Sequence, residues 1–504
     1  MKIPLNSILS TILILICTAL SGHAHSHAKP EHVVTLKQAH KGNLEIDTLL
    51  LDSYGRLPEN ERTFYLESRR HLAGSASARL TNQQIIAAAQ KAGLPLISGP
   101  MLGHLTESAI TVWFRPLYSG VITVQLSDAQ GGQRQYSVKA TTPGAAMRVR
   151  LDRLAPDTSY TYQLIGPSDQ VLGQGSFKTA PEPGSKAKFR IAFGSCYHKI
   201  GIHNPNLMQL ITRRGNHAML LIGDIAVDDR EARFNMHYAD YLLRDVSRAW
   251  RDFAAHIPIY ASWDDHDYLN NDKSGLQKGQ ISKAERRTMR SLWQDNWNNP
   301  PTNVSDRGIY FSTVVGNVEI IMLDTRSCRV WDKRDQRGSY LGEAQSAWLL
   351  ETLKASKAPF IILTSGTMWS DYMSNAKDSW GTWDQPVREE IFSLIEAHDI
   401  AGVILLSGDR HGARGFRIGR PSGFELYEFE AASLGADSGP RAMAPDTSMQ
   451  IFGYPAGILA FGELTFDTTL NEPVVTFRLI NEVGEVLEEH LLDYSRLTPS
   501  KTQP

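Results

Sequence analysis

Apolar runs that end in a polar, chemically active residue recur along the second part of the chain. The four clearest end in Ser195-Cys196, Gly223-Asp224, Trp263-Asp264-Asp265-His266-Asp267 and Gly408-Asp409-Arg410-His411. Runs of four to eight apolar residues bounded by turn residues are typical of buried strands. Strands that each end in Cys, Asp or His predict that their tips converge on one place.

The spacing of apolar residues between the strand-like runs has a helical period. It predicts helices around 204–215, 231–255, 284–297, 343–355 and 386–399, while strands dominate from Phe424 onward. Mixed units followed by antiparallel strands favour an α/β (α+β) fold in which two packed β-sheets are flanked by helices. We expect this domain to span residues 186–495, followed by a tail at 496–504.

The first part of the chain has a different pattern of apolar residues. Residues 25–93 are expected to form a helical extension, with apolar residues at helical spacing in 36–51 and 81–92. Short alternating segments separated by Gly, Pro and Asp fill 94–180, which predicts a β-sandwich. Within it, the stretch 154–164 resembles a late strand of a fibronectin-III-like sandwich. Residues 181–185 form a short linker.

The N-terminus predicts an export signal over residues 1–24. Lys2 precedes an apolar run from Ile8 to Ala19, and small residues allow cleavage after Ala24. The mature protein is therefore expected to be periplasmic or secreted, without a transmembrane anchor. The histidines that follow permit two interpretations, a flexible polar tail or a copper or nickel site.

Composition limits the function. The chain has 504 residues with a formal net charge of −2, which argues against specific nucleic-acid binding. Three cysteines do not make a disulfide framework. A phosphorylated small-molecule or polymer substrate stays open, because a metal site supplies its own positive charge. The oligomeric state cannot be predicted.

Clustered acidic, imidazole and thiol groups repel or cost desolvation energy unless a cation lies between them. A pair of metal ions is the simplest such cation, and it indicates phosphoryl chemistry. Asp224 has two oxygens with which to bridge the ions, and His266 can act as general acid toward a leaving oxygen. Asp264 or Asp267 would orient His266. Arg326, also at a strand end, is either a phosphate contact or a partner of Asp324 or Asp267.

These motifs, in this order, resemble the alkaline phosphatase D (PhoD-like) family of calcineurin-type metallophosphoesterases. The matching phrases are Phe193-Gly194-Ser195-Cys196, Leu221-Ile222-Gly223-Asp224, Trp263 to Asp267 with Asn270-Asn271, Leu323 to Arg326 and Ser407 to His411. The resemblance implies a metallophosphoesterase catalytic domain with two metal ions, iron and calcium, with zinc or manganese as alternatives. It also implies the ligands: Cys196 for the first metal, Asp224 as the bridge, Asp265 and Asn271 for the second, and Asp409 and His411 to complete both.

Two departures from the family pattern affect the metals. Val227 stands where the family commonly has a tyrosine ligand, with Asp228 and Asp229 as possible substitutes. The strand around 363–367 has no histidine, so the second site is poor in nitrogen and favours a hard ion such as calcium.

The sequence therefore predicts an exported phosphoesterase that uses a metal-activated water on phosphate monoesters, diesters or both. Two alternatives remain open. One is a phosphodiesterase or phospholipase-type hydrolase on the same fold, and the other is a non-catalytic, metal-stabilised binding protein.

Overall fold

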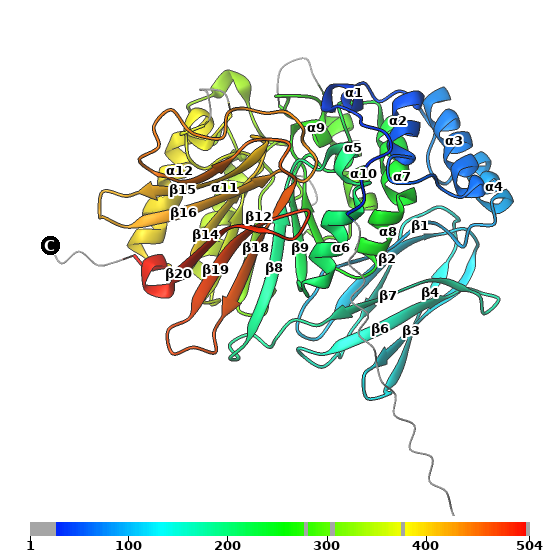
Figure 1. Ribbon diagram of the computed structural model, residues 1–504, viewed down its shortest axis with the longest axis horizontal. Coiled ribbons are helices and arrows are strands. Elements are labelled where there is room, and N and C mark those ends of the chain that lie inside the picture. The colour runs from blue at the N-terminus through cyan, green and yellow to red at the C-terminus, as the bar shows by residue number, and fades with distance from the viewer. Residues whose placement is uncertain (1–26, 277–280, 303–307, 374–377, 500–504) are drawn as a thin grey trace, which may run out of the picture.

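The computed structural model describes residues 27–276, 281–302, 308–373 and 378–499. The predicted signal peptide lies outside the described residues, as does most of the C-terminal tail. Figure 1 shows the central sheets with helices on either side, and a smaller β-structure beside them.

Two sheets form the centre of the larger part of the molecule. The six-stranded sheet has the order β10 (Ile259–Ser262), β9 (Ala218–Ile222), β8 (Lys188–Gly194), β18 (Ala460–Asp467), β19 (Val474–Asn481), β20 (Val486–Asp493). The seven-stranded sheet has the order β11 (Phe311–Val315), β12 (Val318–Met322), β13 (Phe360–Thr364), β14 (Val403–Ser407), β16 (Glu425–Ala432), β15 (Gly412–Gly419), β17 (Gln450–Tyr454). Within them β8, β9 and β10 run parallel, as do β12, β13, β14 and β16.

The parallel strands at the centre of the two sheets are buried on both faces, and their side chains divide by the two-residue period of a strand. In β14, Ile404 and Leu406 enter the core between the sheets, whereas Val403 and Leu405 enter a core on the opposite face. In β9, Leu220 and Leu221 divide in the same way. The predicted double sheet flanked by helices is confirmed.

Helices cover both outer faces. Those of the larger part are α5 (His198–Gly201), α6 (Pro205–Arg213), α7 (Phe234–Val246), α8 (Arg248–Ala254), α9 (Asp265–Tyr268), α10 (Lys283–Asn296), α11 (Gly342–Ala355) and α12 (Trp380–Ala397), with single 3-10 turns at Trp331–Lys333 and Tyr494–Leu497. α11 and α12 pack on the seven-stranded sheet, and α6, α7, α8 and α10 on the six-stranded sheet.

Two helix predictions were wrong in detail. The single helix expected over 231–255 is two helices, because the Ser247 backbone is extended and its hydroxyl accepts from the Trp250 amide to begin α8. The helix expected from 386 starts earlier, at Trp380. Its first turns end in a non-helical residue, Asp384, just before Pro386.

The N-terminal segment forms four helices, α1 (Leu36–Lys41), α2 (Leu44–Leu51), α3 (Glu59–Gly74) and α4 (Gln83–Lys91). The apolar pattern of 36–51 is continuous, but the helix is interrupted at Gly42. This glycine has φ 50°, a left-handed conformation that ends α1 and turns the chain into α2.

Seven strands form two small antiparallel sheets. One contains β1 (Leu96–Gly103), β2 (Ile110–Pro116) and β5 (Met147–Leu151), and the other β4 (Gln133–Ala140), β3 (Gly120–Asp128), β6 (Ser159–Ile165) and β7 (Val171–Lys178). Val112 and Leu151 of the first and Val124 and Leu164 of the second are fully buried in a common core. The predicted β-sandwich is confirmed; β1 was not predicted.

A network of buried ion pairs ties the N-terminal helices to the larger part. Asp47 of α2 accepts from Arg69 of α3 at 2.8 Å and from Lys199 of α5 at 3.4 Å. Asp240 of α7 lies 3.7 Å from Lys199 and forms a two-pronged pair with Arg230, with both distances 2.7 Å. Because every member of the network is buried, each charge depends on its partners.

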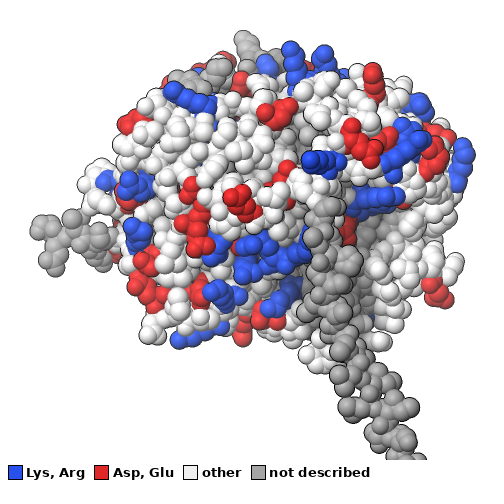
Figure 2. All heavy atoms as spheres, in the orientation of Figure 1, with Lys and Arg blue, Asp and Glu red and all other residues white. Residues whose placement is uncertain are grey.

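No helix among the described residues is long and apolar enough to cross a membrane. Charged side chains of both signs share the surface in Figure 2. Blue Lys and Arg side chains gather in the lower middle of that face, and red Asp and Glu side chains lie among and beside them. This mixture agrees with the near-zero net charge.

Substituting Asp47→Ala is expected to lower the free energy of unfolding by about 3–5 kcal/mol, because it leaves Arg69 and Lys199 buried without their carboxylate. Chemical denaturation measures this change. Glu67→Ala is the matched control in the same helical segment. It removes an exposed pair with Lys91 and should cost less than about 1 kcal/mol. Equal effects of the two substitutions would contradict this account of the network.

Candidate metal centre

The site lies where the carboxyl ends of the two sheets meet. Strands β8, β9 and β10 of one sheet and β14 of the other all deliver their following residues to this edge. Gly408, after β14, touches the opposite sheet so closely that a Cβ there would lie 2.6 Å from Ser195 Oγ and 2.8 Å from the carbonyl oxygen of Ile222. The absence of a side chain at Gly408 therefore lets the two sheets bring their polar tips together.

Four side chains form the first group of potential metal ligands. Cys196, His198, Asp224 and His411 each place one ligand atom within 4.8 Å of all the others. Cys196 Sγ lies 3.8 Å from Asp224 Oδ2, and the Nε2 atoms of His198 and His411 are 3.3 Å apart. One thiol, one carboxylate and two imidazoles form a ligand set suited to iron or zinc.

Both imidazoles of this group are oriented by a second hydrogen bond. His198 Nδ1 lies 2.9 Å from Asp228 Oδ1, and His411 Nδ1 contacts the carbonyl oxygen of Ser438. An Nδ1–H that donates to these oxygens leaves each Nε2 as the free lone pair, directed into the group. Carboxylate and carbonyl acceptors of this kind commonly orient histidine ligands.

Carboxylates dominate the second group. Asp224 and Asp265 lie within ligand distance of each other and of His266, and Asp265 also groups with Asp264 and Asp409. Asp224 is thus shared between the first and second groups. Apart from His266, the donors here are carboxylate oxygens, which suit a hard ion such as calcium.

The structure brings together most of the predicted site residues. Five predicted ligands and the predicted catalytic residue His266 take part in these groups; the five are Cys196, Asp224, Asp265, Asp409 and His411. Asn271 does not join them. Its side chain is exposed and its amide donates to Asp272 Oδ2 at 2.9 Å.

The backbone at the site is strained. Cys196, Asp224 and Asp409 have φ values of 55°, 53° and 73°, and His198 and His411 have 45° and 36°. Non-glycine residues seldom adopt positive φ, and where they do they gather at functional sites. Here the left-handed turns let a strand end deliver its ligand directly into the edge between the sheets.

Burial makes the negative groups costly unless a cation joins them. Asp224 Oδ1 and Asp409 Oδ2 are buried and have no hydrogen-bond partner among the described residues. Burial, together with neighbouring carboxylates, raises the pKa of Asp224 and of Asp409 well above the ordinary range. Burial and the nearby Asp224 also raise the pKa of the Cys196 thiol. These residues fit a metal pair, because bound cations satisfy the open oxygens and stabilise the thiolate.

Arg326 has a different partner from those expected. Its guanidinium is fully buried and binds Asp264 through two nitrogens, with Nη2 2.7 Å from Asp264 Oδ2. The same Nη2 lies 3.7 Å from Asp409 Oδ1 and 3.8 Å from Asp265 Oδ1. The expected pair with Asp324 or Asp267 is therefore replaced by one with Asp264. Although burial opposes it, Arg326 lowers the pKa of Asp265.

His266 is oriented by Asp229 rather than by Asp264 or Asp267. Its Nδ1 lies 2.7 Å from Asp229 Oδ1, which leaves Nε2 for the metal edge. Despite burial, Asp265, Asp224 and Asp229 hold the pKa of His266 well above its ordinary value. Among these three, only Asp229 lies outside the ligand groups.

Asp267 instead shapes the loop after β9. It accepts from the amides of Ile225, Ala226 and Val227 at 3.1–3.4 Å. The Val227 side chain is fully buried in the core. Asp228 and Asp229, considered as substitutes for the missing tyrosine, each orient one histidine.

His198 lies in the first group of potential ligands but was not among the ligands predicted from the sequence. It stands two residues after Cys196, the same spacing as His411 after Asp409. That repeated spacing was the signal available in the sequence. His198 supplies a nitrogen donor to the group in which Val227 offers none.

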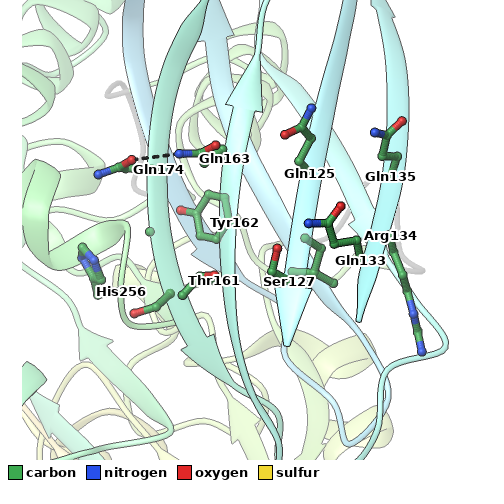
Figure 3. Close-up of a pocket in the computed structure, with 13 residues that line it drawn as sticks. Gln125, Ser127, Gln133, Arg134, Gln135, Thr161, Tyr162, Gln163, Gln174 and His256 are labelled. Carbon is green, nitrogen blue, oxygen red and sulfur yellow. Dashed lines mark hydrogen bonds between the residues drawn. The ribbon is translucent and has the colours of Figure 1, made fainter. Parts of the chain in front are cut away.

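A cavity of about 620 Å³ lies away from these groups, on the outer face of the four-stranded sheet of the β-sandwich. Figure 3 shows that its lining is mostly of uncharged polar side chains, among them Gln125, Gln163 and Gln174, with Arg134 at one end. None of the ligand groups found among the described residues lies there. Its size therefore does not mark it as the chemical site.

Fold and site together define a metal-dependent phosphoric ester hydrolase. Residues 226–452 match the family model described as PhoD-like phosphatase, which confirms the family resemblance seen in the sequence. No curated protein matches the chain by sequence.

Two solved structures show the same fold. A structure of PhoD aligns with a TM-score of 0.64 and 18% identity, covering 81% of this chain and 93% of that one. Purple acid phosphatase PPD1 from yellow lupin (Lupinus luteus) aligns with a TM-score of 0.56 and 15% identity, covering 79% and 75%. At these identities the likeness concerns the fold.

Substituting His198→Ala is expected to lower the bound metal from two ions to one per chain, because the first group loses a nitrogen donor. Asp228→Asn keeps every ligand but weakens the orientation of His198, and should reduce metal affinity about 10–100-fold. Elemental analysis after dialysis against a metal buffer measures both. His256→Ala, at a histidine outside the ligand groups, is the control. Unchanged metal content in His198→Ala would exclude this residue as a ligand.

Proposed function

We propose that the protein is an exported phosphoesterase that hydrolyses phosphate monoesters, diesters or both, with water as the nucleophile. One observation carries the proposal: two groups of metal-ligating side chains share Asp224 at the meeting edge of the sheets. A carboxylate shared in this way can bridge two ions about 3.5–4 Å apart, the spacing used by two-metal phosphatases. The export signal at residues 1–24 supports a periplasmic or secreted location.

The ligand chemistry supports different metals in the two groups. Cys196, His198, Asp224 and His411 would hold iron, with zinc as the alternative. Asp224 and Asp265 would hold calcium, with manganese as the alternative, and Asp409, which groups with Asp265, would add a further oxygen donor. When bound, the ions supply Lewis-acid polarisation of the phosphate and a water of lowered pKa.

His266 is the proton donor in this proposal. The Asp229 carboxylate holds Nδ1, so the proton on Nε2 faces the edge where Asp224 and Asp265 lie. Transfer of that proton to the leaving oxygen, as its bond to phosphorus breaks, releases a neutral alcohol. A positioned acid of this kind contributes about 10²–10⁴-fold to the rate.

Arg326 supports the carboxylates. Its guanidinium, with an exposed fraction of 0%, is enclosed by four carboxylates, those of Asp264, Asp265, Asp378 and Asp409. We assign it to offsetting their mutual repulsion, in place of the phosphate contact expected from the sequence. A second, less buried cation, Arg410, lies 3.8 Å from Asp409 Oδ2.

Substituting Asp224→Asn is expected to reduce turnover at least about 10³-fold, because the shared ligand is lost from both groups. Removing the metals with a chelator should abolish activity, and adding back iron or zinc with calcium should restore it. Measured on an aryl phosphate and on its diester, the same assay separates the monoesterase from the phosphodiesterase.

Gln163→Ala, in the lining of the β-sandwich cavity and outside the ligand groups found among the described residues, is a control for general effects of substitution. A wild-type protein that binds two metals but turns over neither ester would favour the non-catalytic binding protein. Full activity in the Asp224→Asn variant would exclude the two-metal site as the catalytic centre.

A further inference from the structure

A third histidine reaches the site from the N-terminal helical segment. His40, in the last turn of α1, stacks on the ring of His266 with a centroid distance of 4.3 Å and an interplanar angle of 28°. Its ring centroid also lies 5.2 Å from that of His198. The proton donor of the proposed reaction is therefore covered on one face by a residue from outside the region that matches the phosphatase family.

The two nitrogens of His40 face the carboxylates that orient the other two rings. Nε2 lies 3.8 Å from Asp228 Oδ1, and Nδ1 lies 3.7 Å from Asp229 Oδ2. His40, Asp228 and His266 each place one potential ligand atom within 4.8 Å of the others. Asp228 and Asp229, however, already accept hydrogen bonds from His198 and His266. We therefore interpret this cluster as an orienting device rather than a third cation site.

The position of His40 is fixed by contacts on both sides of α1. At the N-terminal end the Leu36 amide donates to Asp437 Oδ2 at 3.3 Å. At the other end the carbonyl oxygen of Gly42 accepts from Arg69 at 2.9 Å and from Arg230 at 3.2 Å. Two buried arginines thus hold the turn that immediately follows His40.

A single anchoring network links His40 to the metal edge. Arg69 also binds Asp47, and Asp47 binds Lys199, the residue next to His198 in the chain. Arg230 directly follows Asp229 in the chain and pairs with Asp240. The residues that hold α1 are therefore neighbours of the residues that orient His198 and His266.

We propose that His40 is a positioning residue that holds the His266 ring in line with the leaving oxygen, so that the N-terminal helical segment forms part of the active site. The inference rests on the proposed function. As water adds to phosphorus, the bond to the leaving oxygen breaks and that oxygen takes the Nε2 proton of His266. The proton lost by the attacking water later restores His266 through solvent.

This role sets which esters depend on His40. An alkoxide is a poor leaving group and needs the proton as the bond breaks, whereas 4-nitrophenolate leaves readily without it. A misplaced acid should therefore slow alkyl esters far more than 4-nitrophenyl esters. The N-terminal helical segment would therefore raise the rate of hydrolysis of esters with aliphatic alcohol leaving groups, such as sugar or glycerol phosphate esters.

The test compares kcat for a leaving-group series of esters, in the class that the wild-type protein hydrolyses, between full-length variants. His40→Ala should lower kcat for the alkyl ester about tenfold and for the 4-nitrophenyl ester less than about threefold, consistent with the cost of small misplacements. His40→Phe, which keeps the stacked ring, should recover most of the alkyl-ester rate. His266→Ala should show the same selectivity as His40→Ala, more strongly.

Lys37→Ala, on the exposed face of the same helix, is the matched control and should leave every rate unchanged. Thermal unfolding of each variant gives a readout independent of turnover, and the midpoint of His40→Phe should stay close to that of the wild type. An equal loss on alkyl and 4-nitrophenyl esters in His40→Ala would overturn the inference while the proposed function stands. A wild-type protein without esterase activity would overturn both.

Discussion

Carboxylates and a thiol buried together where two sheets meet are the constraint on which the rest of this structure depends. Asp224 Oδ1 and Asp409 Oδ2 are enclosed without a hydrogen-bond partner among the described residues, and the Cys196 thiol lies beside them. Burying an unpaired carboxylate costs several kcal/mol, and a chain does not gather several at one edge without compensation. Bound cations would provide that compensation, and in the proposed function they would also supply the chemistry.

The residues around the ligand groups form successive shells, from the strand ends that carry the ligands to the ion pairs of the N-terminal helices. Parallel strands deliver ligands from both sheets, and left-handed turns at residues such as Asp224 and Asp409 aim them inward. Behind the ligand groups, two consecutive carboxylates each orient one imidazole. Asp228 orients His198, and Asp229 orients His266. The ion pairs that fasten the N-terminal helices begin immediately beyond these residues. Metal site, proton donor and N-terminal segment are therefore one connected arrangement.

The sequence predicted those parts whose signal is local. Apolar runs ending in Cys or Asp located four strand tips, and with them Cys196, Asp224, Asp265 and Asp409. What it could not predict depends on contacts between distant segments or on loop geometry. His40 is an ordinary helical residue until α1 is packed against His266, and the partner of Arg326 depends on how two strand ends meet. The helix break at Ser247 was not predicted because the apolar periodicity continues through it. The break depends on a single hydroxyl, that of Ser247, which caps the start of α8.

The most direct measurement is anomalous X-ray diffraction from crystals of the protein purified without chelator, with data collected at the absorption edges of iron, zinc and manganese and at a long wavelength for calcium. The account predicts two anomalous peaks about 3.5–4 Å apart on either side of Asp224, one bound by Cys196 and one facing Asp409. A site in which these residues bind no ion, or a single ion that Asp224 does not touch, would contradict it.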